Sequence, residues 1–94
     1  MNLDTQPIVI GDDEILNFST DESADSFEAS VLDVHLNEMF VPDAVFVDGT
    51  TNQVDVSLSK AQTTLIGWDR VVLQVTWIRN GQCENARVFL KGER

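Results

Sequence analysis

The chain has 94 residues, of which 43% are hydrophobic, and its formal net charge is −10. This length and composition predict one globular domain over residues 1–94, not a disordered chain or two domains. All 6 Lys and Arg residues lie beyond residue 59, whereas residues 1–59 hold 13 of the 16 acidic groups. Such an acidic chain is not expected to bind nucleic acid, because phosphate contacts need basic side chains.

The first half of the chain predicts short strands separated by polar turns. Residues 1–7 are interpreted as a flexible polar lead, followed by strands at residues 8–10 and 15–18. Apolar and polar side chains alternate over residues 27–31, which indicates a further strand. The apolar positions then change parity, which predicts a β-bulge or a bend. A helix over residues 26–39 is the alternative interpretation.

The centre of the chain predicts an edge strand, an alternating strand and a helix start. Pro42 has no N–H to donate, so the strand expected at residues 44–47 belongs at a sheet edge. Residues 54–58 alternate, with their apolar side chains facing inward. Ser59 and Gln62 then have the spacing of a capping box, which predicts a short helical turn.

The strongest signal is a hairpin over residues 70–91, centred on Asn80-Gly81. Two β-rich runs flank this pair, which supplies the two positive φ angles of a type I′ turn. A two-residue loop fixes the register and places Val71 opposite Leu90 on an apolar face. Together the elements predict an all-β fold, a small Greek-key or immunoglobulin-like β-sandwich with one short helical turn.

Few side chains are suited to catalysis or metal binding. His35 is the only histidine, so neither a catalytic triad nor a usual zinc site is expected. Cys83, the only cysteine, has just one basic neighbour across the hairpin turn, so a reactive thiolate is not expected. The acidic clusters at residues 12–14 and 21–25 lack the spacing of a calcium-binding EF-hand. We therefore predict a non-enzymatic protein without a metal or cofactor.

Side chains of the last hairpin are candidates for contact with other proteins. Trp77 lies opposite Glu84 near the tip, where core packing is the favoured interpretation and a partly exposed anchor for a partner is the alternative. The acid-only first half and the basic last third predict two unlike surfaces, suited to salt-sensitive head-to-tail contacts. The predicted interface residues are Trp77, Arg79, Arg87 and Lys91.

The sequence is not expected to contain a membrane segment or a signal peptide. No apolar run approaches the roughly 18 residues of a membrane span, so no membrane segment is expected. The opening residues Met1–Asp4 lack a basic region followed by an apolar run, so no signal peptide is expected. We expect a protein of the reducing cytosol, or one released by cell lysis.

Residues 52–92 resemble the small immunoglobulin-like domains of tailed-phage tails, baseplates and fibres. The shared pattern is a strand ending in Leu58-Ser-x-x-Gln-Thr63, a second strand, an Asn-Gly hairpin and a closing strand. Residues 7–12 and 26–31 are similar to the first strands of that family, whereas residues 35–48 depart from it. The resemblance implies a virion structural or accessory protein, made in the host cytoplasm, that binds other virion proteins or itself.

A different class of protein also fits the charge. The acidic first half is typical of a small inhibitor or DNA mimic that occupies a basic site on a host protein. The basic last strand argues against this alternative, because the same basic site would repel it.

Overall fold

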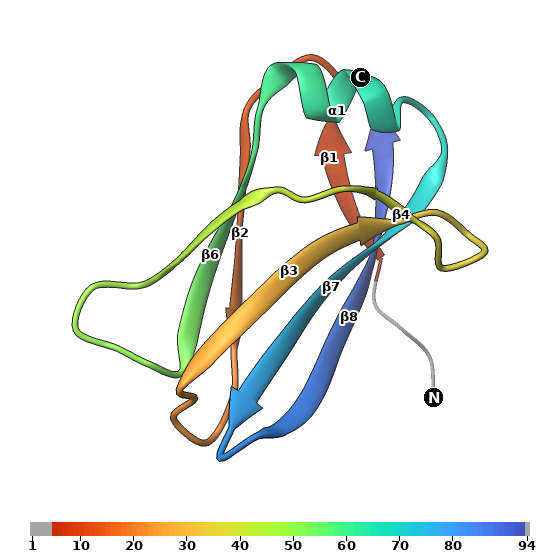
Figure 1. The fold of residues 1–94 in the computed structure, drawn as a ribbon. Helices are drawn as coiled ribbons and strands as arrows, with labels where there is room; N and C mark the ends of the chain where they lie inside the picture. The colour runs from red at the N-terminus through yellow and green to blue at the C-terminus, as the bar shows by residue number, and fades with distance from the viewer. Residues whose placement is uncertain (1–4, 94) are drawn as a thin grey trace.

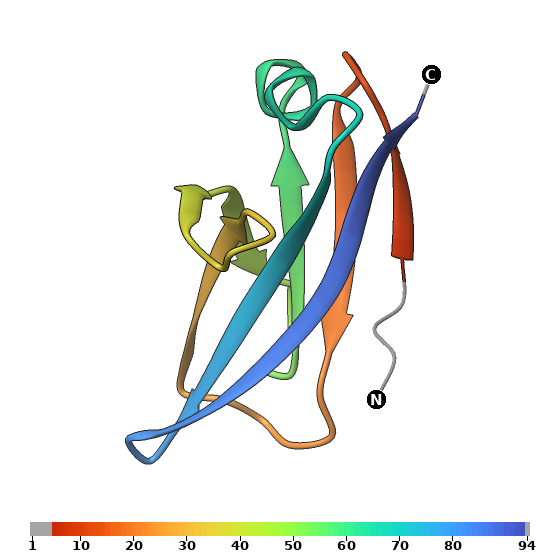
Figure 2. The same cartoon turned by 90° about the vertical axis from the view of Figure 1, so that its right-hand side faces the viewer.

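In a computed structural model that describes residues 5–93, the chain folds into two β-sheets and one short helix (Figure 1). The predicted all-β sandwich is thereby confirmed. The elements are β1 (Thr5–Val9), β2 (Glu14–Ser19), β3 (Ser26–Leu32), β4 (Glu38–Phe40), β5 (Asp43–Phe46), β6 (Gln53–Leu58), α1 (Lys60–Ile66), β7 (Arg70–Arg79) and β8 (Gln82–Glu93). In both views the long strands β7 and β8 run at an oblique angle to β2 and β6 (Figure 2).

The strand order is that of an immunoglobulin-like sandwich. The five-stranded sheet has the order β1-β8-β7-β3-β4, and the three-stranded sheet has the order β2-β6-β5. Strands β2, β6 and β5 therefore occupy the positions of strands B, E and D, and β3, β7 and β8 those of C, F and G. β4 continues the larger sheet beyond β3, as the additional strands of variable-type domains do.

β7 and β8 form the predicted hairpin in the predicted register. Asn80 and Gly81 have φ angles of 50° and 79°, as a type I′ turn requires. Val71 pairs with Leu90 and Trp77 pairs with Glu84. The turn chemistry and the apolar pattern agree on one register, because a shift by one residue would turn the buried side chains to the surface.

The hydrophobic core lies between the two sheets. The inward side chains of β7, including Leu73 and Val75, face those of β6, including Val54 and Val56, and all four are fully buried. Burial of each such side chain stabilises the fold by roughly 1.5–3 kcal/mol.

β3 ends in the predicted irregularity and not in a helix. Its pairing with β4 shifts register between Val31 and Leu32, which confirms the predicted irregularity, a β-bulge or a bend, at this point. The helix considered over residues 26–39 is wrong, because residues 26–31 alternate between more exposed and more buried side chains and residues 26–32 pair with β7. The strand spacing of the apolar residues outweighs their partial helical spacing.

The turn between β3 and β4 is held by one carboxylate. Asp33 Oδ1 accepts hydrogen bonds from the backbone N–H groups of His35, at 2.8 Å, and Asn37, at 3.0 Å. The N–H of Asn37 is the main cause of the lowered pKa of Asp33, with a further contribution from His35. Leu36, within this turn, has a φ angle of 63°, a conformation that costs a non-glycine residue about 1–2 kcal/mol.

β1 begins earlier in the chain than the sequence predicts. Thr5–Pro7, expected to belong to a flexible lead, are part of the strand, which pairs in parallel with β8. The remaining residues of that lead, 1–4, lie outside the described residues. The strand tolerates Pro7 because β1 is at the edge of its sheet, where a missing N–H removes no central ladder bond.

α1 begins with the predicted capping box and ends against β8. The Ser59 side chain accepts from the Gln62 N–H at 3.2 Å, and the Gln62 side chain accepts from the Ser59 N–H at 2.9 Å. The helix ends at Ile66 and is capped by Gly67, whose backbone lies directly over Gly92 of β8. A Cβ atom at Gly92 would overlap the Gly67 carbonyl and lie 2.9 Å from Ile10 Cγ1, so only glycine fits there.

Candidate protein-binding surfaces

A stripe of basic side chains lies on the outer side of the five-stranded sheet. Arg70 pairs with Lys91 and Gln74 pairs with Arg87, and both pairs have the opposite parity to the inward-facing pairs Val71/Leu90 and Leu73/Val88 of the hairpin. The Arg70 guanidinium lies 5.4 Å from the centre of the Phe89 ring, and Arg87 Nε donates to Gln74 Oε1 at 2.6 Å. We call Arg70, Arg87 and Lys91 the basic face. Its three side chains are exposed.

Acidic side chains on this side of the sheet lie toward its margins. Glu28 and Glu38 are on β3 and β4, and Glu93 is at the end of β8. The basic residues therefore lie on the two strands of the hairpin, with Glu28 and Glu38 on the strands to one side and Glu93 at the end of β8.

The outer side of the three-stranded sheet carries only acidic charge. Asp55 lies on the central strand β6, where it accepts a hydrogen bond from Asn17 at 3.0 Å, and Asp43 lies on β5. Ile15 and Val45 share this side and are 69% and 64% exposed. We call Asp43, Asp55, Ile15 and Val45 the acidic face. It joins two exposed apolar side chains to a negative surface on the opposite side of the sandwich from the basic face.

Arg79 is occupied by contacts within the molecule. Its guanidinium donates to the carbonyls of Glu22 and Ser23 at 2.9 and 3.1 Å and to Thr20 Oγ1 at 2.7 Å, and it forms a 3.0 Å ion pair with Glu84. The hydrogen bond from Arg79 is the largest cause of the lowered pKa of Glu84. The side chain of Arg79 is only 18% exposed, so it holds the β2–β3 loop to the hairpin tip instead of forming part of the basic face.

Trp77 packs in the core, as the favoured interpretation predicts, and its inclusion among the interface residues is wrong. Its side chain is 1% exposed, because it lies on the inward side of β7 between the sheets. Trp68, in the connection between α1 and β7, is 62% exposed instead. The sequence pattern indicated the correct pairing with Glu84, but the packing of the opposite sheet, which covers Trp77, is not visible in a local pattern.

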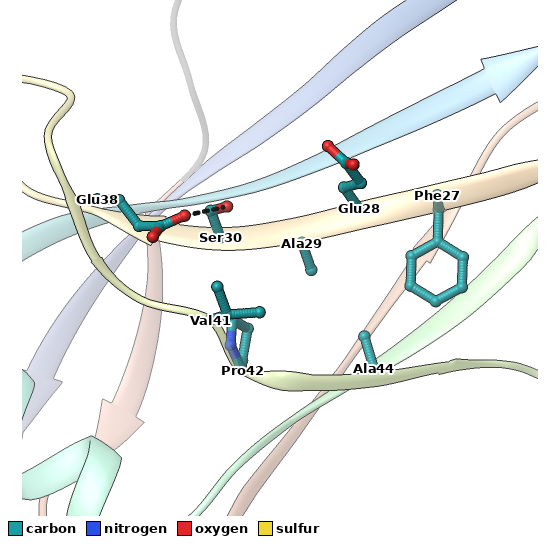
Figure 3. Close-up of a pocket in the computed structure, with 8 residues that line it drawn as sticks. All are labelled: Phe27, Glu28, Ala29, Ser30, Glu38, Val41, Pro42 and Ala44. Atoms are coloured by element: carbon teal, nitrogen blue, oxygen red, sulfur yellow. Dashed lines mark hydrogen bonds between the residues drawn. The ribbon is translucent and has the colours of Figure 1, made fainter.

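A groove lies beside β3, where its pairing with β4 stops (Figure 3). β4 pairs only with Val31 and Leu32. Within residues 5–93, the remaining part of β3, Ser26–Ser30, therefore has no strand on this side. The groove has a volume of about 510 Å³, and the segment Val41–Ala44 forms its other wall.

The part of the chain that the structure describes contains no group of three or more His, Cys, Asp or Glu side chains placed to hold a metal ion. His35 is exposed in the β3–β4 turn, and Cys83 is an exposed free thiol beside the hairpin turn. No helix in residues 5–93 has the length and hydropathy needed to cross a membrane.

Sequence comparison adds no relative from which a function could be transferred. No protein-family model matches the chain, and no curated protein matches it in sequence. The resemblance to virion domains therefore stays a prediction, and function has to be argued from the surfaces.

Sequence reasoning found two of the three residues of the basic face and none of the acidic face. Arg70 could have been added from the hairpin register, because it lies opposite Lys91. Asp43 and Asp55 come together only because β5 pairs with β6, a pairing that no local pattern indicates.

Proposed function

We propose that the protein is a non-enzymatic structural or accessory protein of a bacteriophage virion that acts through protein–protein assembly contacts. The observation that carries this proposal is the pair of unlike faces on opposite sides of the sandwich. The virion setting rests on the resemblance of residues 52–92 to phage domains. The partner is another copy of the chain or another virion protein.

The two faces are suited to head-to-tail assembly. Arg70, Arg87 and Lys91 of one copy would lie against Asp43 and Asp55 of the next. Complementary charges of this kind steer association and fix its orientation. A contact between two different faces of one chain repeats from copy to copy, and it closes into a ring or extends into a filament.

Each face also carries apolar side chains that can contribute to binding in addition to its charges. Ile15 and Val45 are exposed on the acidic face, and the Phe89 ring lies beneath Arg70 on the basic face. The net charge of −10 repels copies from one another at longer range. The acidic face of one copy can therefore approach closely only where a neighbour presents its basic residues.

Sedimentation velocity over a series of salt concentrations tests this proposal. We expect self-association, or binding to a particle protein, that weakens as salt rises, because exposed charges are screened beyond about 8–10 Å at physiological ionic strength. Lys91→Glu should weaken association. Lys60→Glu, which changes the net charge equally but lies on α1 and on neither face, should not.

A monomer at every salt concentration, with no co-purifying particle protein, would support the alternative of a small acidic inhibitor or DNA mimic. The acidic face is compatible with this alternative function, because it carries no basic residue and presents two exposed apolar side chains.

A further inference from the structure

We propose that the open edge of β3 binds an extended, basic peptide segment of a partner protein, which adds to the five-stranded sheet as a short strand. This site is separate from the basic and acidic faces, and it goes beyond the proposed head-to-tail contact.

The backbone of β3 is available for pairing on one side. Residues 26–32 pair with β7 on the other side, whereas β4 covers only Val31 and Leu32. A strand edge presents N–H and C=O groups that can form main-chain bonds with an added strand. Ser26–Ser30 contain no proline and no bulge, two of the devices by which proteins block such edges.

The groove gives an added strand a place for its side chains. The side chains of Phe27 and Ala29 point toward Val41 and Ala44, and the Glu28 side chain points to the other side of β3 (Figure 3). Because strand side chains alternate, an added strand would turn every second side chain toward the apolar wall. The groove volume of about 510 Å³ is within the range of about 300–1,000 Å³ typical of ligand pockets.

The charge of the site selects the partner. Glu28 and Glu38 line the groove, and neither forms an ion pair within residues 5–93. Glu38 also accepts a hydrogen bond from Ser30 at 3.3 Å, which holds its carboxylate beside the open edge. The side chains that alternate with the apolar ones would lie beside these carboxylates. The best ligand is therefore a segment in which small apolar residues alternate with Lys or Arg.

Fluorescence anisotropy with synthetic peptides tests this inference. The probe is a labelled peptide of about nine residues with alternating Val and Lys, long enough to cover the open part of β3 at about 3.3 Å per residue. We expect it to bind, and we expect a Val–Glu peptide and a Val–Lys peptide N-methylated at alternate positions not to bind. Equal binding of all three, or binding of none, would overturn the proposal.

Matched charge variants locate the site. Glu28→Lys with Glu38→Lys should weaken binding by about tenfold. Asp48→Lys with Asp69→Lys, which makes the same change in net charge away from the groove, should leave the affinity unchanged. If the two double variants lower the peptide affinity equally, binding is only nonspecific charge attraction, and the proposal is contradicted.

Hydrogen exchange separates an added strand from other modes of binding. The bound Val–Lys peptide should slow amide exchange within residues 26–30. If self-association of the protein slows exchange in this segment and the peptide does not displace the second copy, the edge binds a second copy of the chain. That result would overturn the proposal.

The charge reversal Arg87→Glu with Lys91→Glu should leave peptide binding intact. If peptide binding fails while salt-dependent self-association persists, only the β3 site is refuted. If self-association fails and peptide binding persists, only the head-to-tail contact is refuted.

Discussion

Replacement of Gly92 by alanine should destabilise the domain strongly, because the end of α1 lies directly on this position of β8. The added methyl would overlap the Gly67 carbonyl oxygen, with the Gly67 carbonyl carbon at 2.7 Å and Ile10 Cγ1 at 2.9 Å. Two of these atoms are backbone, so rotation of a side chain cannot relieve the overlap. The helix end, with its buried Ile66, has to move away from the core.

Overpacking of a well-packed site costs about 1–3 kcal/mol, and we expect a value near 3 kcal/mol because a backbone segment must shift. Domains of this size are stable by about 5–15 kcal/mol in total, so the loss is a large share. In urea the unfolding midpoint should fall by about 2 M.

Gly11→Ala is the matched control for this prediction. Gly11 has a φ angle of 86°, and a Cβ atom there has no neighbour within 4 Å. This substitution should cost only the strain of a positive φ angle, about 1–2 kcal/mol. If Gly92→Ala is no more destabilising than Gly11→Ala, the close packing of α1 on β8 is refuted.

Three further predictions concern the turns. Gly81→Val should lower the free energy of unfolding by about 1–3 kcal/mol, and an unchanged urea midpoint would contradict the type I′ turn. Leu36→Gly should raise the free energy of unfolding by about 1 kcal/mol, because glycine adopts the positive φ angle of this position without strain. Leu36→Ala should not raise it, and equal free energies of unfolding for the two variants would refute strain at Leu36. The pKa of Asp33 is lowered in the folded protein, so its ionised carboxylate stabilises the fold at any pH above its ordinary pKa of 3.8. This stabilisation is lost as the pH falls through the lowered pKa of the folded state. The difference in Tm between the protein and Asp33→Ala should therefore narrow on acidification; a constant difference would contradict the role given to the carboxylate.

Local sequence signals were sufficient for the elements that depend on neighbouring residues. The hairpin and its register follow from the Asn80-Gly81 pair, which favours positive φ angles, and from the alternation of apolar and polar residues on either side of it. The capping box at Ser59 located the start of α1. Both signals act through hydrogen bonds or conformations within a few residues, which is why they can be recognised without knowledge of the fold.

The rest of the architecture depends on contacts between distant segments. The parallel pairing of β1 with β8 includes Pro7, a residue that ordinarily argues against a strand and is accepted only at an edge. The burial of Trp77 depends on the opposite sheet, and the contacts of Arg79 depend on a loop far away in the sequence. The open edge of β3 results from the shortness of β4, which the sequence pattern does not predict.

The central claim is that unlike faces of the sandwich meet in assembly, and a mixing experiment tests it most directly. The double variant Arg87→Glu with Lys91→Glu makes the basic face acidic. The double variant Asp43→Lys with Asp55→Lys makes the acidic face basic. Each variant alone should sediment as a monomer at low salt, because its two faces then carry the same sign of charge.

An equimolar mixture of the two variants should associate again in sedimentation velocity, because the acidic surface of each Arg87→Glu, Lys91→Glu copy then meets the basic surface of an Asp43→Lys, Asp55→Lys copy. The association of the mixture should weaken as salt rises. If the mixture stays monomeric at low salt while the unmodified protein associates, the contact is not made between these two faces, and the account of assembly is contradicted.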